Sequence, residues 1–266
     1  MTQKIKVAAI GMDTRLGELE ANHRRAEALI TRAAEAGAEL IALPETWNLG
    51  FYPQNVAQLA EEGGKSSNTL IRCLAQKYGV TIFSGSIAER RGDVIYNTTY
   101  VFNKQGDCIS EYQKIHLYTH GKEHEYFTPG SKPAIFTTAG VKWGHIICYD
   151  LRFTELSRLL ALQGAQVLLV PAQWLCARID HWRTLLQARA IENQFYTIGI
   201  NSTGMMVNDI PACGHSLVVN PRGEIMIEAG QTEEILVVEL DLSLVDQVRR
   251  EFALLPDRRP DVYRLE

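Results

Sequence analysis

Residues 4–10 read Lys-Ile-Lys-Val-Ala-Ala-Ile and residues 40–45 read Leu-Ile-Ala-Leu-Pro-Glu, which are two short apolar segments with room for one helix between them. Across residues 16–36 the apolar side chains recur at helical intervals, and Gly37 is a suitable C-cap. A strand, a helix and a second strand ended by Pro44 predict a parallel pair joined by a right-handed crossover. The chain therefore opens with a βαβ unit, which indicates an α/β fold.

The same periodicities predict the elements that follow. Further helices are expected over residues 67–78, 153–163, 180–193 and 242–252, and strands over residues 80–87, 94–102, 108–113, 143–147, 166–170, 195–200, 215–219, 224–227 and 235–240. Hairpin turns are predicted at residues 103–106 and 220–223, since both segments end in a glycine that can take positive φ. Residues 116–132 show no clear period and are rich in Gly, His and Glu, which predicts a functional loop.

The strands outnumber what one parallel sheet would need, and helices alternate with them along the whole chain. Two sheets packed face to face, with helices on both outer faces, would bury both sheets. No linker, low-complexity tract or short repeat divides residues 1–266. The pattern therefore favours one domain, a four-layer αββα sandwich over residues 1–266, with residues 256–266 as a C-terminal tail.

Composition excludes several classes of protein. The chain has 266 residues, 46% of them hydrophobic and 22% charged, and a net charge of −4 with scattered basic residues, which argues against nucleic-acid binding. No apolar run approaches the ~20 residues that span a bilayer, and the first residues do not resemble a secretory signal. Five cysteines, at positions 73, 108, 148, 176 and 213, show no CxxC or metal-ligand spacing. We therefore expect a cytoplasmic protein with reduced thiols and no membrane partner.

Three chemically reactive residues lie where predicted strands end. Glu45 follows Leu-Ile-Ala-Leu-Pro, Lys114 follows Ile-Ser-Glu-Tyr-Gln, and Cys148 follows Trp-Gly-His-Ile-Ile at a strand-to-helix turn. Because open α/β sheets place ligand crevices at the carboxyl ends of their strands, the three side chains could meet at one point. Each also has an ordinary explanation, since a cysteine in this position is often a small buried hydrophobe and a lone Glu or Lys is usually solvated.

The segments around these residues form three motifs, Leu-Pro-Glu-Thr-Trp at 43–47, Tyr-Gln-Lys-Ile-His-Leu at 112–117 and Cys-Tyr-Asp-Leu-Arg-Phe at 148–153. In residue type, order and separation they resemble the three signatures of the nitrilase superfamily, the carbon–nitrogen hydrolases. The similarity extends from the first strand to nearly the C-terminus. It implies a catalytic triad of Glu45, Lys114 and Cys148, an αββα sandwich, dimerisation of such sandwiches, and no metal or organic cofactor.

Elementary chemistry supplies a role for each member of this triad. The Cys148 thiol becomes a good nucleophile only as a thiolate, and Glu45 would take its proton if a dry site keeps the proton affinity of that carboxylate high. Lys114 would stay cationic and hold the oxyanion of the tetrahedral intermediate, with a second hydrogen bond from the backbone N–H of Tyr149. The resulting thioester on Cys148 would be hydrolysed by a water molecule that Glu45 activates.

The resemblance also implies a second carboxylate in the loop after Lys114. Glu123, in the segment Gly-Lys-Glu-His-Glu-Tyr-Phe at 121–127, matches best, and Glu125 is the competitor. A solvated loop acid is the ordinary alternative for either residue.

The residues after the cysteine indicate a branch of the superfamily. Tyr149 replaces the Trp that commonly follows the nucleophile in nitrile-hydrolysing members, and segments 181–182, 187–194, 214–216 and 220–224 are similar to the ω-amidase and deaminated-glutathione amidase branches. Those relatives act on amides at the far end of small 2-oxo dicarboxylic acids. The expected substrates are a small amide, such as 2-oxoglutaramate or a succinamate-like molecule, and water. Residues 201–206 depart from the ω-amidase pattern, so an N-carbamoyl or aliphatic amide hydrolase stays open.

Three residues are candidates for substrate binding. Arg152 offers a fork geometry that suits a carboxylate, although an arginine there could equally pair with a structural acid. Trp174 is expected to line the pocket. His181 is a weaker candidate at the start of a predicted helix, where capping or packing is the alternative.

Other enzyme classes find less support. None of the seven histidines lies in a motif typical of Cys–His hydrolases, no Gly-x-Ser-x-Gly elbow is present, and residues 11–14 lack a dinucleotide-binding pattern. The non-enzymatic alternative is a catalytically silent scaffold of the same fold, which predicts damage to at least one triad position. All three positions are intact.

Overall fold

The βαβ unit expected at the start of the chain is present in the computed structural model, which describes residues 4–207 and 210–263. Strand β1 (Lys4–Gly11) runs parallel to β2 (Leu40–Ala42), and helix α1 (Leu19–Glu35) connects them. The helix begins later than predicted because Gly17 takes a φ of 75°. It ends where Gly37, with a φ of 82°, leaves the helical conformation.

The first sheet has the strand order β13-β1-β2-β4-β5-β6, with the short β3 beside β4. Its other elements are β3 (Glu61–Glu62), β4 (Thr81–Arg91), β5 (Val94–Phe102), β6 (Cys108–Gln113), β13 (Glu234–Asp241), α2 (Val56–Leu59) and α3 (Lys65–Tyr78). Strand β13 is antiparallel to β1 along eight residue pairs, so that Lys4 lies opposite Asp241 and Gly11 opposite Glu234. The last strand of the chain therefore completes the sheet that the first strand begins.

The second sheet has the order β12-β11-β10-β9-β8-β7. Its elements are β7 (Ala134–Thr138), β8 (Val141–His145), β9 (Val167–Ala172), β10 (Tyr196–Asn201), β11 (Leu217–Val219), β12 (Ile225–Glu228), α4 (Thr154–Leu162) and α5 (Ile179–Asn193), and α6 (Ser243–Glu251) follows β13. The sequence predicts that strand β9 ends before Pro171, but the strand continues through this residue. A proline is tolerated there because Leu169 is the last residue of β9 that pairs with β8. Strand β7 escapes prediction because it is a short edge strand in which only Phe136 is buried.

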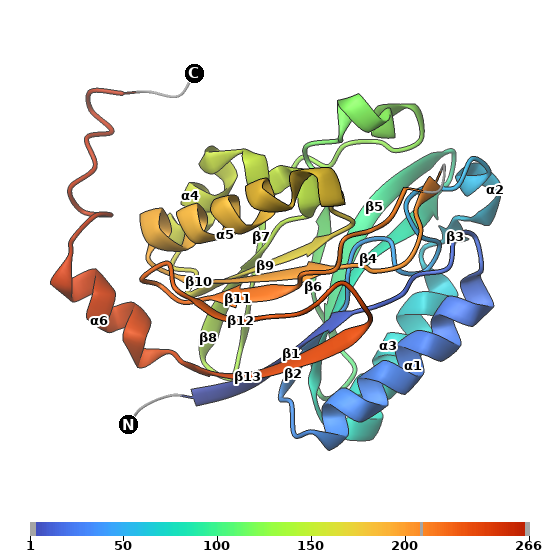
Figure 1. The fold of residues 1–266 in the computed structure, drawn as a ribbon, viewed down its shortest axis with the longest axis horizontal. Helices are drawn as coiled ribbons and strands as arrows, with labels where there is room; N and C mark the ends of the chain where they lie inside the picture. The colour runs from blue at the N-terminus through green and yellow to red at the C-terminus, as the bar shows by residue number, and fades with distance from the viewer. Residues whose placement is uncertain (1–3, 208–209, 264–266) are drawn as a thin grey trace.

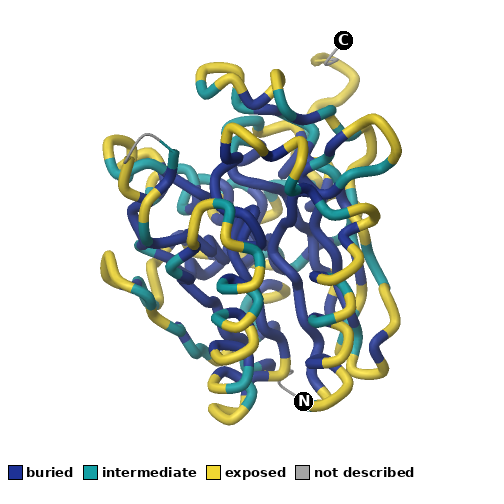
Figure 2. The backbone as a smooth tube through the Cα atoms, turned by 90° about the vertical axis from the view of Figure 1, so that its right-hand side faces the viewer, coloured by how far each residue is buried: buried dark blue, intermediate teal, exposed yellow. Residues whose placement is uncertain are grey.

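Helices α1 and α3 cover one outer face, and α4 and α5 cover the other (Figure 1). Three apolar clusters fill the spaces between these layers. The cluster between the sheets includes Val7, Phe83, Val101, Trp143 and Leu169, and separate clusters lie beneath each helical layer. Figure 2 shows the same division, with buried backbone in the centre and exposed backbone along the outer helices and turns. The predicted αββα sandwich is confirmed.

The C-terminal tail leaves the sandwich after α6 and runs clear of both sheets (Figure 1). Val262 and Tyr263 are exposed along it. The tail was predicted over residues 256–266, of which residues 264–266 lie outside the described part of the chain. Among the described residues, no helix has both the length and the apolar character needed to cross a membrane.

His145, in β8, is fully buried between the two sheets. Its Nδ1 lies 2.9 Å from Thr99 Oγ1 and its Nε2 lies 2.9 Å from Ser110 Oγ. The rings of Phe83 and Tyr112 contact it edge-on. Burial lowers the pKa of His145 from 6.5 to about 3, because the imidazolium would lose its hydration.

This buried imidazole predicts a pH dependence of stability. Below about pH 6.5 the unfolded chain binds a proton at His145, whereas the folded chain stays neutral there down to about pH 3, so its contribution to stability is complete above pH 6.5 and falls as the pH drops. At about pH 5 the loss is roughly 2 kcal/mol. We expect His145→Gln to lose this part of the dependence of the unfolding free energy on pH, measured by urea unfolding at about pH 7.5 and about pH 5.

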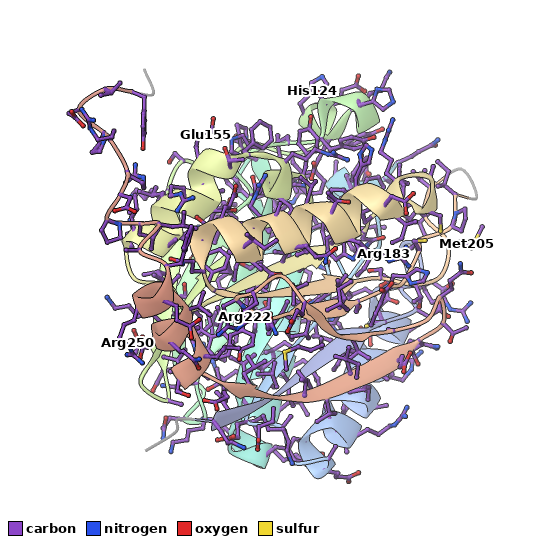
Figure 3. All side chains as sticks on the ribbon, turned by 60° about the vertical axis from the view of Figure 1, so that its left-hand side comes forward. His124, Glu155, Arg183, Met205, Arg222 and Arg250 are labelled. Atoms are coloured by element: carbon purple, nitrogen blue, oxygen red, sulfur yellow. The ribbon has the colours of Figure 1, made fainter. Side chains whose placement is uncertain are left out.

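His124→Gln is the matched control, because His124 is exposed on the 3-10 helix η2 (Glu123–Glu125; Figure 3). The unfolding free energy of that variant should depend on pH as it does in the parent protein. The same pH dependence in His145→Gln would show that His145 does not cause the loss of stability at low pH.

Candidate active site

Glu45, Lys114 and Cys148 lie together in one buried site at the carboxyl ends of three strands. Glu45 follows β2, Lys114 follows β6, and Cys148 lies just beyond β8 at the start of the 3-10 helix η3 (Cys148–Arg152). Lys114 Nζ donates a hydrogen bond of 2.8 Å to Glu45 Oε1, and Cys148 lies close enough to both side chains for their charges to act on its thiol. The structure thus brings together the three side chains that the motifs single out.

Backbone contacts with β4 fix the position of Glu45. Ser86 N donates to Pro44 O at 3.0 Å at a register shift in β4. A side chain at Gly85 would place its Cβ 2.1 Å from Pro44 O, so only glycine permits this approach. On the other side, Gln173 N donates to Glu45 Oε2 at 2.9 Å, and Gln173 Nε2 donates to Glu45 O at 2.9 Å. The carboxylate is therefore held by both sheets.

Cys148 occupies a strained turn, with a φ of 46°. The buried carboxylate of Asp150 supports this turn by accepting hydrogen bonds from Ile147 N at 3.0 Å, Tyr112 Oη at 2.6 Å and His116 N at 2.8 Å. Within residues 4–207 and 210–263, the N–H of Tyr149 donates to no acceptor. It is therefore available to an oxygen atom of a ligand.

Glu123, which the resemblance puts forward as the second carboxylate, lies in this site. Its side chain is fully buried, and its two oxygens accept hydrogen bonds of 2.9 and 2.8 Å from Lys114 Nζ. Tyr118 N donates a further bond of 2.6 Å to Glu123 Oε2. Glu125 is instead at the surface, where its carboxylate lies 3.4 Å from Lys122 Nζ.

Asn97 and Gln173 also belong to the site, although the sequence analysis did not identify them. Asn97 Nδ2 donates to Glu45 Oε1 at 2.8 Å and to Glu123 Oε1 at 3.2 Å, and thereby bridges the two carboxylates. Gln173 follows the end of β9, so the strand-end criterion that identified Glu45 could have found it. Asn97 gave no such signal, because it lies inside β5.

Burial and charge set the protonation of the site. Burial raises the pKa of Cys148 well above its usual value, and the negative charge of Glu45 adds to this, while Lys114 opposes it only in part. Burial alone would lower the pKa of Lys114, but the charges of Glu123 and Glu45 outweigh it and raise that pKa well above its usual range. These shifts favour a thiol at Cys148 and an ammonium group at Lys114 near neutral pH.

A small pocket opens onto the Cys148 sulfur. It is lined by Phe51, Tyr118, Cys148, Tyr149, Arg152, Gln173, Trp174, Leu175 and Arg178, and we call it the reaction pocket. Arg152 and Trp174, both predicted to bind substrate, are in this lining, and Arg152 Cζ lies 4.7 Å from the centroid of the Trp174 ring. His181 is outside the lining, with its Nδ1 3.4 Å from Arg152 Nη1. Among the described residues Arg152 forms no ion pair with a carboxylate.

The arrangement is suited to acyl transfer. The Cys148 thiol and Tyr149 line the pocket, and a buried carboxylate and ammonium group, those of Glu45 and Lys114, lie next to the thiol. These are the groups that a thiol nucleophile, its proton acceptor and a pair of oxyanion donors require. Over the described ranges, no group of three or more His, Cys, Asp or Glu side chains is placed to hold a metal ion.

Known proteins share this fold and sequence along almost the whole chain. The Carbon-nitrogen hydrolase family model matches residues 6–250. The chain is 38% identical over 260 residues to the 2-oxoglutaramate amidase of Bacillus subtilis (strain 168), covering 98% of this chain and 100% of that protein. It is 34% identical over 279 residues to the omega-amidase NIT3 of Saccharomyces cerevisiae, covering 99% and 96%. The crystal structure of Saccharomyces cerevisiae Nit3, described as a member of branch 10 of the nitrilase superfamily, matches with a TM-score of 0.90 at 34% identity, covering 97% of each chain.

Proposed function

The chain belongs to the carbon–nitrogen hydrolase family, and we propose that it hydrolyses the terminal amide of a small carboxylic acid, such as 2-oxoglutaramate or succinamate, to the acid and ammonia. As a member of this family it is a hydrolase that acts on linear amides. The observation that carries the proposal is the buried cluster of Glu45, Lys114, Glu123 and Cys148 beside a pocket that contains Arg152. The names of the two relatives support the choice of substrate class.

The first half of the reaction forms a thioester. Cys148 Sγ attacks the amide carbon while Glu45 accepts the thiol proton, and the carbonyl electron pair moves to oxygen. Lys114 Nζ and the Tyr149 N–H donate hydrogen bonds to that oxyanion. When the intermediate collapses, the carbon–nitrogen bond breaks, and the departing nitrogen takes the proton from Glu45 and leaves as ammonia.

The second half releases the acid. A water molecule attacks the thioester carbon and gives a proton to Glu45, and the new oxyanion accepts the same two hydrogen bonds. Collapse breaks the carbon–sulfur bond, and the proton returns from Glu45 to the Cys148 sulfur. Glu123 is a positioning residue in this scheme, because its carboxylate keeps Lys114 charged and in place.

Arg152 would bind the carboxylate at the far end of the substrate. Its guanidinium lies over Trp174 in the pocket wall. We expect Arg152→Gln to lower kcat/KM for succinamate by about 10- to 100-fold, mainly through KM, because a hydrogen-bonded charge pair is lost. Butyramide has the same chain length and no carboxylate, so its kcat/KM should change less than about threefold. The measurement is the rate of ammonia release.

Arg250→Gln provides the control for this prediction, since Arg250 is exposed on α6, away from the pocket (Figure 3). Its kcat/KM for succinamate and for butyramide should equal that of the parent protein. Equal losses for succinamate and butyramide in Arg152→Gln would remove Arg152 from carboxylate recognition.

A substrate panel tests the proposed function itself. Succinamate, 2-oxoglutaramate, deaminated glutathione, an aliphatic amide, an N-carbamoyl amino acid and a nitrile would be compared by kcat/KM. The two small ω-amides should rank first. A higher value for the N-carbamoyl or the aliphatic compound would favour the alternative hydrolases, and no turnover of any member would favour the catalytically silent scaffold.

We also propose that the protein is a cytoplasmic homodimer in which the C-terminal tail reaches a partner. The exposed apolar side chains Val262 and Tyr263 on the tail, and Leu159 and Leu162 on α4, support a partner surface there. Light scattering of the full chain and of a chain ending at residue 255 tests the idea. If both form oligomers with the same number of chains, the tail has no role in dimerisation. The cytoplasmic location stays a prediction.

A further inference from the structure

Tyr52 is buried next to the candidate active site but is absent from the lining of the reaction pocket. Burial raises the pKa of Tyr52, the charge of Glu123 adds to this and Lys114 opposes it, so the hydroxyl lies close to both groups. That hydroxyl donates a hydrogen bond of 2.8 Å to Gly121 O. Tyr52 belongs to the segment that follows Glu45, and Gly121 belongs to the loop that carries Glu123. One hydrogen bond therefore joins the segments of the two carboxylates.

The backbone of Tyr52 has an unusual conformation. Its φ of 22° is positive, which a residue with a large side chain rarely adopts. Pro53 follows directly, and the residue before a proline favours an extended conformation instead. Gly50, with a φ of 80°, turns the chain just before it. Such strain persists only where the surrounding structure enforces it, and it is concentrated at functional sites. The direction of the Tyr52 side chain therefore calls for a functional explanation.

The acceptor side of this contact is equally constrained. A Cβ at Gly121 would lie 2.5 Å from Tyr52 Oη and 2.5 Å from Tyr118 Cδ1, so only glycine lets the two segments approach. Ring packing adds to the contact, since the centroids of the Tyr52 and Tyr126 rings are 5.5 Å apart. Residues on both sides of Glu123 therefore contact Tyr52.

Gly121 and Glu123 belong to one tight turn. The N–H groups of both residues donate to the same acceptor, Tyr118 O, each at 3.1 Å. A displacement of Gly121 therefore displaces Glu123, whose two oxygens accept hydrogen bonds of 2.9 and 2.8 Å from Lys114 Nζ. Because hydrogen bonds weaken steeply when their geometry is lost, a small shift of this turn would weaken the hold on Lys114.

We propose that Tyr52 is a positioning residue for amide hydrolysis, and that its hydroxyl holds the Glu123 carboxylate against Lys114 through Gly121. This inference rests on the proposed function, in which Lys114 stabilises the oxyanion. Three observations favour it over ordinary core packing: the hydrogen bond itself, the strained backbone of its donor, and an approach at its acceptor that only glycine permits.

Tyr52→Phe tests the proposal, because it removes the hydroxyl and keeps the ring. For the amide of the substrate panel that the parent protein hydrolyses fastest, we expect kcat to fall about 3- to 10-fold, the effect of one neutral hydrogen bond. KM should stay within about twofold, because Tyr52 does not line the reaction pocket. Product release measures both constants.

Tyr126→Phe is the matched control. Tyr126 lies in the same loop and contacts the Tyr52 ring, but its hydroxyl bonds to no other described residue. Its kcat and KM should equal those of the parent protein. The same loss of kcat in both variants would overturn the inference, because it would assign the effect to ring packing in the loop.

A double-mutant cycle separates positioning from general stabilisation. If Tyr52 acts through Glu123, Tyr52→Phe should lower kcat less than about 1.5-fold when it is added to Glu123→Gln, since that side chain no longer presents a charge to Lys114. An equal loss with and without the Glu123 carboxylate would overturn the inference. An unaltered kcat in the single variant, or a loss confined to KM, would do the same.

The reaction of Cys148 with iodoacetamide gives a readout that does not depend on turnover. Burial raises the pKa of Cys148, and the charge of Glu123 adds to this. A displaced carboxylate should therefore let the thiol of Tyr52→Phe react about two- to threefold faster at a fixed neutral pH. If the parent protein hydrolyses no amide, the proposed function fails, and this rate still tests the contact. An unchanged rate would then overturn the role of Tyr52 as well.

Discussion

Cys148→Ala is expected to abolish amide hydrolysis, with kcat falling on the order of 10⁶-fold, the scale seen when a nucleophile that works with a general base is removed. In the proposed mechanism the thiol forms the bond to the amide carbon, so Glu45, Lys114 and Tyr149 would still bind a substrate in Cys148→Ala but would have no nucleophile to activate. In the parent protein, a slow substrate should add one acyl group to the peptide that carries Cys148. Mass spectrometry of both proteins measures this adduct, which should be missing in Cys148→Ala.

Cys213→Ala is the matched control, because Cys213 is another buried cysteine near the pocket. Its thiol lies beside that of Cys176, and its N–H donates to Trp174 O at 3.3 Å. We expect its kcat to stay within about twofold of the parent value. Residual activity above about one hundredth in Cys148→Ala, or the same loss in Cys213→Ala, would contradict the assignment of the nucleophile.

Glu123→Gln is expected to lower kcat by about 10²- to 10³-fold, comparable to the loss of an oxyanion donor. The amide cannot supply the negative charge that both oxygens of Glu123 present to Lys114 Nζ. Lys114 would then be paired with Glu45 alone, which weakens Glu45 as a base and shifts the ammonium away from the oxyanion. Steady-state kinetics of ammonia release measures this loss.

A second measurement separates positioning from a general structural defect. The charge of Glu123 contributes to the raised pKa of Cys148, so its removal should lower that pKa and increase the thiolate fraction. Cys148 in Glu123→Gln should therefore react faster with iodoacetamide at a fixed neutral pH, although turnover is slower. A damaged fold would not produce these opposite changes at this one residue.

Glu125→Gln serves as the comparison for this pair. Its side chain is 48% exposed and lies beside that of Lys122, which is 71% exposed. Exposed ion pairs of this kind contribute little to stability, so kcat and the rate of reaction of Cys148 with iodoacetamide should match those of the parent protein. An unaltered kcat in Glu123→Gln would show that Glu123 has no part in turnover. A lower kcat in Glu125→Gln would show that the effect comes from a change in the whole loop.

The sequence predicted the architecture well because the fold depends on strong local patterns. Buried strands alternate with amphipathic helices, and glycines such as Gly37 and Gly79 mark helix ends with positive φ. Placing Glu45, Lys114 and Cys148 at strand ends followed from the same patterns, and the three motifs singled them out together. The parallel pairing of β1 with β2 is likewise a local consequence of the first 45 residues.

Some supporting residues could not be predicted, because their contacts are with distant segments of the chain. Asn97 looks like an ordinary polar residue of an alternating strand, and only the approach of Glu45 and Glu123 gives it a function. The choice between Glu123 and Glu125 depends on two short 3-10 turns separated by Lys122, which has a φ of 58°. Arg178 lies in the segment Cys-Ala-Arg, which carries no periodic signal, and only the folded pocket reveals it.

The pairing of β13 with β1 has a consequence for how the protein is made. Residues 4–11 are translated long before their neighbours at residues 234–241, because all the other strands of this sheet lie between them in the sequence. Until then the edge of the nascent sheet stays open, and an open edge invites association with other chains. Biosynthesis of this hydrolase therefore includes a long interval in which protection by chaperones would matter most at its N-terminal strand.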